Sequence, residues 1–311
     1  MSRMLPIAGL VATGLVTTGL VTTGLAAILP ALLATTAHAQ QPQQPPFATT
    51  KVEGTENVYI FRFGGHQSMF IVTPAGVIAT DPIGLRRPAA KAYIEEIEKI
   101  TKAPIRYVIY SHSHFDHIAG GKPFKDKGAT FVAHTNAKAR IQEVKDPDVV
   151  VPDQVVTGSK RNITLGGTTL ELNYVGKNNS NSTLVMRLPK EKIIFTVDWI
   201  PLNGVQFRGM ADNYLPDMEQ GLKKVIAMDW ERMIPGHPGP GGRLGNKDDA
   251  RTALSYLQDL SAAVKEAASQ GKCYADAMRD IKLPKYESFG NYAANLPMNV
   301  ERYCDYYNRG I

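Results

Sequence analysis

Histidine and cysteine are both scarce in this 311-residue chain, which contains seven of the first and two of the second. Cys273 and Cys304 stand outside any metal-binding motif, so the sequence offers no metal site built from cysteine thiolates. Charged residues form no block of five or six of one sign, although 35 basic and 29 acidic residues leave a net charge of +6. This balance indicates a solvated surface and argues against nucleic acid as a partner.

The few histidines are concentrated in two short patches: His112, His114 and His117 lie in SHSHFDH, and His237 lies in IPGHPG. Neutral imidazole and carboxylate groups are ligands that a borderline divalent ion such as zinc prefers. Alternate residues of an extended segment share a face, so His112, His114 and Asp116 can point into one cleft. A turn begun at Asp116 would bring His117 in beside them. The pattern predicts a metal site rather than a solvated loop.

The first patch follows residues 105–110 (IRYVIY), whose β-branched and aromatic side chains are typical of a buried strand. A ligand cluster at the end of a buried strand is where an open α/β architecture carries its chemistry. An H-x-H-x-D-H motif after such a strand, followed by a single aspartate and then a PGH, resembles the metallo-β-lactamase fold of metallohydrolases. The resemblance covers residues 58–260.

The resemblance implies roles for residues outside the first patch. In the family, Asp81 in GVIATDP corresponds to an aspartate that supports the ligands from behind, at the end of an early strand. Asp198 in IIFTVDW corresponds to the aspartate that bridges or binds the metals, and His237 corresponds to the last ligand. The implied fold class is α/β, a four-layer αβ/βα sandwich, here with a helical C-terminal segment.

One position departs from the family pattern. The third histidine of the first metal should stand in a G-x-x-H loop, but here the loop is YVGKNNSNST, and Asn179 occupies that position. An amide oxygen is a weaker zinc ligand than imidazole, so a first site of His112, His114 and Asn179 should hold metal poorly. We therefore expect one tightly bound Zn²⁺ per chain at a second site. Its ligands would be Asp116, His117, Asp198 and His237.

These ligands predict a zinc metallohydrolase that uses a metal-bound hydroxide, since zinc lowers the pKa of its bound water to about 7. Asp116 or Asp198 would orient the hydroxide, and His114 would act as an acid or base. The long segment after Asp198 would form a pocket for a flat or hydrophobic small molecule, with ordinary packing as an equal alternative. Its candidate wall residues are Trp199, Phe207, Arg208, Met210 and Tyr214.

Two histidines remain outside the patches in the expected domain. His66 lies in FGGHQSMF, a segment that in the family often forms a loop over the site. It is a candidate substrate contact, although a structural role is the favoured alternative. His134 is expected to be structural.

The family includes β-lactamases, lactonases, thioester hydrolases, phosphodiesterases and sulfatases, so the fold alone does not identify the substrate. The SHFDH patch, the altered ligand and the aromatic loop are similar to exported one-zinc members that dehalogenate electron-poor chlorinated aromatics such as chlorothalonil. Hydrolysis of a lactone, ester or β-lactam is the alternative. A mononuclear iron persulfide dioxygenase or a non-catalytic binder is the alternative of another class, since two histidines and an aspartate can also bind iron.

Residues 1–39 resemble an export signal, with Arg3 at the start, an apolar stretch over residues 7–33 and a small-x-small site at residues 37–39. A membrane anchor is the alternative because the stretch exceeds about 18 residues. Pro30 and the frequent glycine and threonine favour cleavage, which would leave a periplasmic or secreted protein without a stable membrane anchor. A Gln/Pro-rich spacer over residues 40–50 would precede the domain.

The catalytic domain is expected over residues 51–270, followed by a helical, aromatic-rich extension over 271–311. This extension would serve core packing or a homodimer, with pocket lining as the less favoured alternative. In an oxidising compartment Cys273 and Cys304 could pair, and two unpaired buried thiols are equally expected. Hydrophobic patterning predicts strands over 58–63, 69–73, 76–80, 105–110, 130–133, 168–175, 183–188, 192–197 and 232–234. Helices are predicted over 88–102, 136–144, 217–228 and 247–269.

Overall fold

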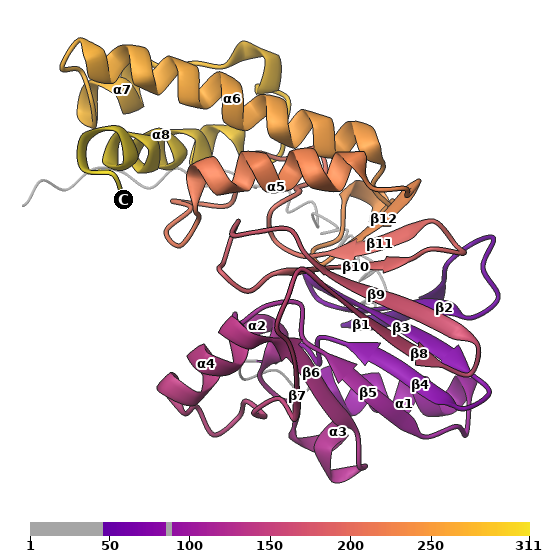
Figure 1. Ribbon diagram of the computed structural model, residues 1–311. Helices are drawn as coiled ribbons and strands as arrows, with labels where there is room; N and C mark the ends of the chain where they lie inside the picture. Colours follow the sequence, from indigo (N-terminus) through magenta and orange to yellow (C-terminus); the bar gives the residue numbers. More distant parts are fainter. Residues whose placement is uncertain (1–45, 85–88) are drawn as a thin grey trace, which may run out of the picture. The chain divides into compact units, whose positions relative to one another are not determined.

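The computed structural model describes residues 46–84 and 89–311, which build two sheets with helices on their outer faces (Figure 1). The expected leader over 1–39 and the first part of the spacer lie outside these residues. Within the described ranges, the helices are all too short or too polar to span a membrane.

The first sheet contains seven strands in sequence order. They are β1 (Phe47–Lys51), β2 (Val58–Phe63), β3 (His66–Thr73), β4 (Gly76–Thr80), β5 (Ile105–Ile109), β6 (Thr130–His134) and β7 (Gln154–Val156). Strands β1 to β4 pair antiparallel, and β4 to β7 pair parallel. The carboxyl ends of β4 and β5 therefore lie at the same edge of the sheet.

The second sheet has the order β12-β11-β10-β9-β8. Its strands are β8 (Lys160–Leu165), β9 (Thr168–Tyr174), β10 (Leu184–Leu188), β11 (Ile193–Thr196) and β12 (Arg232–Pro235). Only β11 and β12 pair parallel within it. The segments after β11 and β12 consequently leave the sheet side by side.

Alternating side chains on the strands divide the apolar residues among three clusters. One cluster lies between the two sheets and includes Ile78, Met186 and Phe195. Neighbouring strand residues point the other way: Ala79 lies in the cluster on the outer face of the first sheet, and Ile194 in that of the second. A helix layer, two facing sheets and a second helix layer result, as Figure 1 shows.

Helices α1, α3 and α4 cover the first sheet, and α5, α6 and α8 cover the second (Figure 1). The bounds are α1 (Ala89–Ile100), α2 (Phe115–Ile118), α3 (Lys122–Asp126), α4 (Thr135–Val144), α5 (Leu215–Ala227), η1 (Pro240–Gly242), α6 (Lys247–Ser269), α7 (Ala275–Asp280), η2 (Pro284–Tyr286) and α8 (Tyr292–Arg309). The long helix α6 begins with a capping box, in which Asn246 and Asp249 satisfy each other's backbone N–H groups.

The C-terminal segment packs on this second helix layer. Tyr286 and Tyr303 are buried in the same cluster as Trp199 and Leu257. Cys273 and Cys304 form a disulfide that ties the segment before α7 to α8, a pairing that the sequence left open.

The four-layer α/β sandwich with a helical C-terminal region confirms the expected fold class. The predicted longer strands and helices are present with shifts of a few residues at their ends. Three strands were not predicted: β1, which overlaps the expected spacer, and the neighbouring β7 and β8. β7 has three residues, and the threonine-containing β1 and β8 bury few side chains, so none shows a strong hydrophobic alternation.

Candidate metal centre

The candidate site lies at the edge where the carboxyl ends of parallel strands from both sheets meet. The SHSHFDH segment leaves β5, and Asp81 follows β4 in the same sheet. Asp198 follows β11, and His237 follows β12 in the second sheet. Side chains from both sheets therefore converge at one place, because each follows the carboxyl end of a parallel strand.

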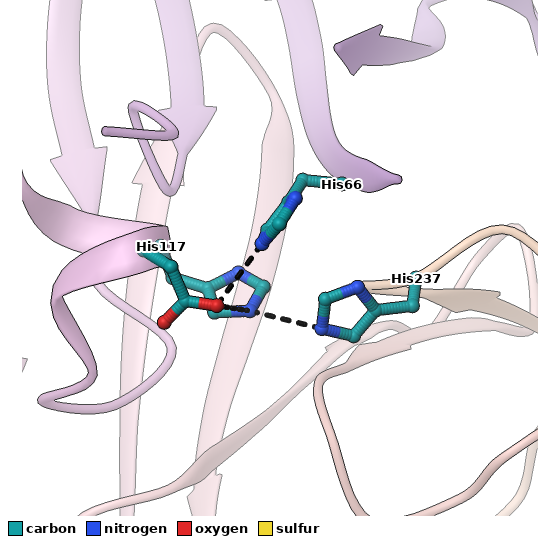
Figure 2. A group of neighbouring side chains, drawn as sticks. His66, His117 and His237 are labelled. Atoms are coloured by element: carbon teal, nitrogen blue, oxygen red, sulfur yellow. Dashed lines mark hydrogen bonds and ion pairs between the residues drawn. The ribbon is translucent and has the colours of Figure 1, made fainter. Parts of the chain in front are cut away.

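Four side chains, which we call the four-residue group, converge there: His66, Asp116, His117 and His237. Their ligand atoms all lie within 4.8 Å of one another. The distance from Nε2 of His66 to Oδ2 of Asp116 is 3.0 Å, and that from Nε2 of His117 to Nε2 of His237 is 3.3 Å. Figure 2 shows the three histidines pointing toward one another from the start of β3, from α2 and from the loop after β12.

A second set, the three-residue group, consists of His112, His114 and Asp198. Oδ2 of Asp198 lies 2.9 Å from Nε2 of His112, whereas Oδ1 lies 2.8 Å from Nε2 of His237. Asp198 therefore stands between the two groups, in the bridging position that the sequence resemblance implies.

The backbone is strained where two of these carboxylates leave their strands. Asp81 and Asp198 both have positive φ, 24° and 75°. Such conformations cost about 1–3 kcal/mol for residues other than glycine. In this chain the strained positions aim Asp81 and Asp198 at the histidines.

Asp81 supports His112 through a serine. The backbone N–H and the hydroxyl of Ser111 donate to the Asp81 carboxylate at 2.7 and 2.6 Å. Since that hydroxyl donates to Asp81, it accepts from Nδ1–H of His112 at 2.8 Å. Nε2 of His112 then carries a lone pair that faces Oδ2 of Asp198 at 2.9 Å, so two acceptors meet there without a hydrogen bond between them. Burial lowers the pKa of His112 to about 4, which keeps the ring neutral.

A contact with the backbone sets the tautomer of His237. Its Nδ1 donates to the carbonyl oxygen of Gly65 at 2.7 Å, so Nε2 carries the lone pair that faces the group. Burial would lower the pKa of His117, but the carboxylates of Asp198, Asp81 and Asp116 raise it to about 9. Lone pairs and carboxylates thus converge on a place that favours positive charge, and this donor set fits a divalent cation.

His114 lies between two carboxylates. Its Nδ1 is 3.1 Å from Oδ2 of Asp198, and its Nε2 contacts the carboxylate of Asp212. Burial would lower the pKa of His114, but these two hydrogen bonds raise it to about 10. Asp212 was not predicted, although it lies in the segment after Asp198 that the sequence assigned to the site.

Asn179 lies beside the three-residue group, on the loop between β9 and β10. Its side-chain nitrogen donates to Oδ2 of Asp198 at 3.4 Å, and its oxygen accepts from the hydroxyl of Thr183 at 3.0 Å. The nitrogen, which has no lone pair to offer a cation, is therefore the end directed at Asp198.

The residues that were expected to line a substrate pocket lie in different surroundings. Trp199 and Met210 are buried in the core beneath the second sheet's helices, so they do not line an open pocket. Trp199 donates to the hydroxyl of Thr196 and packs against α5 at Gly221. Phe207 is 68% exposed, with Arg208 over its ring. Tyr214 stands at the start of α5, beneath the ammonium of Lys177.

His66 also differs from the favoured expectation. It is buried within the four-residue group and is not a structural histidine remote from the ligands. His134 lies outside both groups: it accepts a hydrogen bond from the backbone N–H of Asn136 at the start of α4 and stacks on Tyr174.

A family model described as the metallo-beta-lactamase superfamily matches residues 62–264. The chain is 23% identical to the alpha subunit of 2,4-dinitroanisole O-demethylase from Nocardioides sp. (strain JS1661), over 78% of this chain and 72% of that subunit. A stereoselective inverting sec-alkylsulfatase from Pseudomonas sp. superposes with a TM-score of 0.66 and 17% identity, covering 84% of this chain and 50% of the sulfatase. A metallo-β-lactamase from Pseudomonas aeruginosa, in its mono-zinc form, superposes with a TM-score of 0.59 and 17% identity, covering 71% and 98%.

Proposed function

The chain belongs to the metallo-β-lactamase superfamily, and we propose that it is a zinc hydrolase that holds one tightly bound ion and replaces a leaving group on an electron-poor aromatic ring. The observation that carries the proposal is the four-residue group, which gathers three imidazoles and one carboxylate beside Asp198 and His114. This donor set suits zinc. The mono-zinc form of the β-lactamase from Pseudomonas aeruginosa supports zinc and a count of one for the same fold.

Bound zinc would polarise the substrate and lower the pKa of a bound water to about 7, which supplies hydroxide at neutral pH. Asp198 lies where it can accept a hydrogen bond from that water, because its Oδ1 faces His117 and His237. His114 lies on the other side of the Asp198 carboxylate and is partly exposed, so it can exchange a proton with substrate. Asp212 would hold the ring of His114 in place.

The substrate class is supported by the relative named for 2,4-dinitroanisole. That compound carries two nitro groups, which withdraw electrons from the ring carbon bonded to methoxy. In the proposed reaction a hydroxide oxygen forms a bond to this carbon, the bond from the carbon to the methoxy oxygen breaks, and methoxide takes a proton to leave as methanol. An electron-poor ring with chloride would react in the same way and release chloride and a proton.

Dehalogenation of chlorothalonil-like compounds is the narrower form of this proposal. It depends on the resemblance noted in the sequence, because the relatives described above are named for a methoxy compound, a sulfate ester and β-lactams. Hydrolysis of a lactone, ester or β-lactam would use the same residues and is the second candidate, supported by the superfamily itself.

The decisive experiment combines metal analysis with a substrate panel on the purified protein. We expect about one zinc per chain, and formation of yellow 2,4-dinitrophenolate from 2,4-dinitroanisole that stops on chelation and returns with zinc. In ¹⁸O-labelled water the label should enter the phenol, because the ring carbon is attacked. Turnover of nitrocefin, a phenyl ester or a lactone without turnover of either aromatic compound would favour the second candidate. Iron with oxygen uptake, or metal without any turnover, would contradict hydrolysis.

We also propose that the protein is exported and works without a stable membrane anchor. The disulfide between Cys273 and Cys304 supports an oxidising compartment such as the periplasm. Fractionation of cells expressing the full chain, with N-terminal sequencing of the product, tests this. A product that begins near Gln40 in the periplasmic or secreted fraction is the expected result.

A further inference from the structure

We infer that His66 is a direct ligand of the metal ion, so that three imidazoles and Asp116 hold it. The inference rests on the proposed function, since it concerns the ion that the hydrolase would bind. It adds a ligand from the β2–β3 hairpin to those supplied by the SHSHFDH segment and by the loop after β12.

The distances within the four-residue group match a tetrahedral site. Zinc bonds to nitrogen and oxygen of about 2.0–2.1 Å place neighbouring donor atoms of a tetrahedron about 3.3 Å apart. Here Oδ2 of Asp116 lies 3.0 Å from Nε2 of His66 and 3.6 Å from Nε2 of His117. Nε2 of His117 lies 3.3 Å from Nε2 of His237. Nε2 of His66 therefore lies at the spacing that a fourth donor would have, and all four ligand atoms lie within 4.8 Å of one another.

The imidazole ring of His66 also lies close to the rings of His117 and His237. Its ring centroid lies 5.0 Å from that of His117 and 4.6 Å from that of His237. Figure 2 shows all three rings directed at one centre. Two imidazole nitrogens such as those of His117 and His237 face each other stably only when a proton or a cation lies between them.

The hairpin that carries His66 is fixed to the loop that carries His237. A two-residue Gly64–Gly65 turn, with Gly64 at a φ of 56°, reverses the chain so that Phe63 pairs with His66. The backbone N–H of the next residue, Gln67, donates to Gly236 at 2.7 Å. Together with the contact between Gly65 and His237, these bonds hold His66 in its position before a metal arrives.

A direct ligand at this place would explain how one ion is held tightly while the three-residue group has no third imidazole. With His66 the group supplies four protein donors, and Oδ1 of Asp198 lies beside them, 3.2 Å from Nε2 of His117. Asp198 can then contact the water, and His114 can contact the substrate. His66 would then be the residue that completes the proposed one-zinc site.

The test compares wild type with His66→Ala and His66→Gln, and uses His134→Ala as the matched control, since His134 is a buried histidine outside both groups. Zinc affinity is measured by competition with a chelator, and zinc X-ray absorption counts the bound imidazoles. We expect His66→Ala to bind zinc at least about 100-fold more weakly, beyond the usual effect of residues behind the ligands. The imidazole count should fall from three to two, and His134→Ala should match wild type.

His66→Gln separates a ligand from a residue that only positions Asp116. Glutamine can still donate a hydrogen bond to Asp116, but its amide is a poor zinc ligand. If His66→Gln recovers wild-type affinity, or if His66→Ala keeps three bound imidazoles, the inference is wrong while the proposed zinc hydrolase stands. A wild-type protein that holds no divalent ion would overturn both.

Discussion

The side-chain nitrogen of Asn179 donates a hydrogen bond to Asp198, and the side-chain oxygen of Asn179 is held by Thr183. The amide thus presents its donor end where the family pattern places a third imidazole. Burial would raise the pKa of Asp198, but His117, His112 and His114 hold it well below the usual value, so Asp198 is stabilised as a carboxylate. We therefore expect the three-residue group to serve hydrogen bonding and the four-residue group to hold the metal.

The contact between His114 and Asp212 predicts a loss of turnover without a loss of metal. His114→Ala should lower kcat by about 100-fold or more, the usual contribution of a positioned acid or base. Asp212→Asn should lower kcat less, because the ring keeps its contact with Asp198. Zinc content should stay at the wild-type value in both variants. The exposed Asp126→Asn serves as control, and full turnover by a zinc-loaded His114→Ala protein would refute the role.

The convergence of most residues of the candidate site could be predicted, because they either share one short motif or directly follow strands. His112 to His117 stand in six residues, and Asp198 and His237 come two residues after β11 and β12. Parallel pairing then brings them together. His66 could not be assigned in this way, because its position depends on a hairpin that reaches across to the loop after β12.

The segment after Asp198 was predicted less well because its side chains are placed by packing contacts, some of them with the C-terminal helix α8. The aromatic side chain of Trp199 gives no sign of which way it points, and contacts with Thr196 and Gly221 direct it into the core. Asp212 contacts His114 from a loop whose carbonyl oxygens at Met210 and Asn213 accept hydrogen bonds from Arg302 of α8. The second relationship is not visible in the local sequence, because Arg302 and Met210 are 92 residues apart.

The contact of α8 with this loop yields a second prediction. The guanidinium of Arg302 donates to the carbonyl oxygens of Met210 and Asn213 at 3.1 and 2.7 Å, on either side of Asp212. Arg302→Ala should free the loop and reduce kcat, with unchanged zinc content. Arg309→Ala, on the exposed end of the same helix, is the control. Equal kcat for both variants would show that α8 does not position the loop.

The disulfide predicts a stability difference. Cys273 and Cys304 enclose a loop with a sequence separation of 31, for which the loop-closure relation gives about 3–4 kcal/mol. The Cys273→Ser, Cys304→Ser double variant should lose about this free energy of unfolding in denaturant titrations. Reduction of wild type with a thiol should produce a similar loss, and no change in either experiment would show that the bond does not stabilise the fold.

The contacts of Glu171 with Arg187 and Lys160 predict that the stability of the fold changes with pH. Burial would raise its pKa, but hydrogen bonds from Arg187 and Lys160 hold the pKa below the ordinary value of 4.5. The unfolded chain therefore binds the proton more readily, and the contribution to stability is complete above pH 4.5 and lost as the pH falls through the folded pKa. Glu171→Gln should be less stable than wild type at pH 7 by about 1–2 kcal/mol. The difference should shrink below pH 4.5, and a difference independent of pH would contradict this.

The division between the two groups is tested most directly by the zinc content of wild type and of Asn179→His, measured side by side by elemental analysis after removal of loosely bound metal. We predict one zinc per chain in wild type and two in Asn179→His, because the new imidazole would complete a first site with His112 and His114. Two zinc ions in wild type would contradict the account, since both groups would then bind metal despite Asn179.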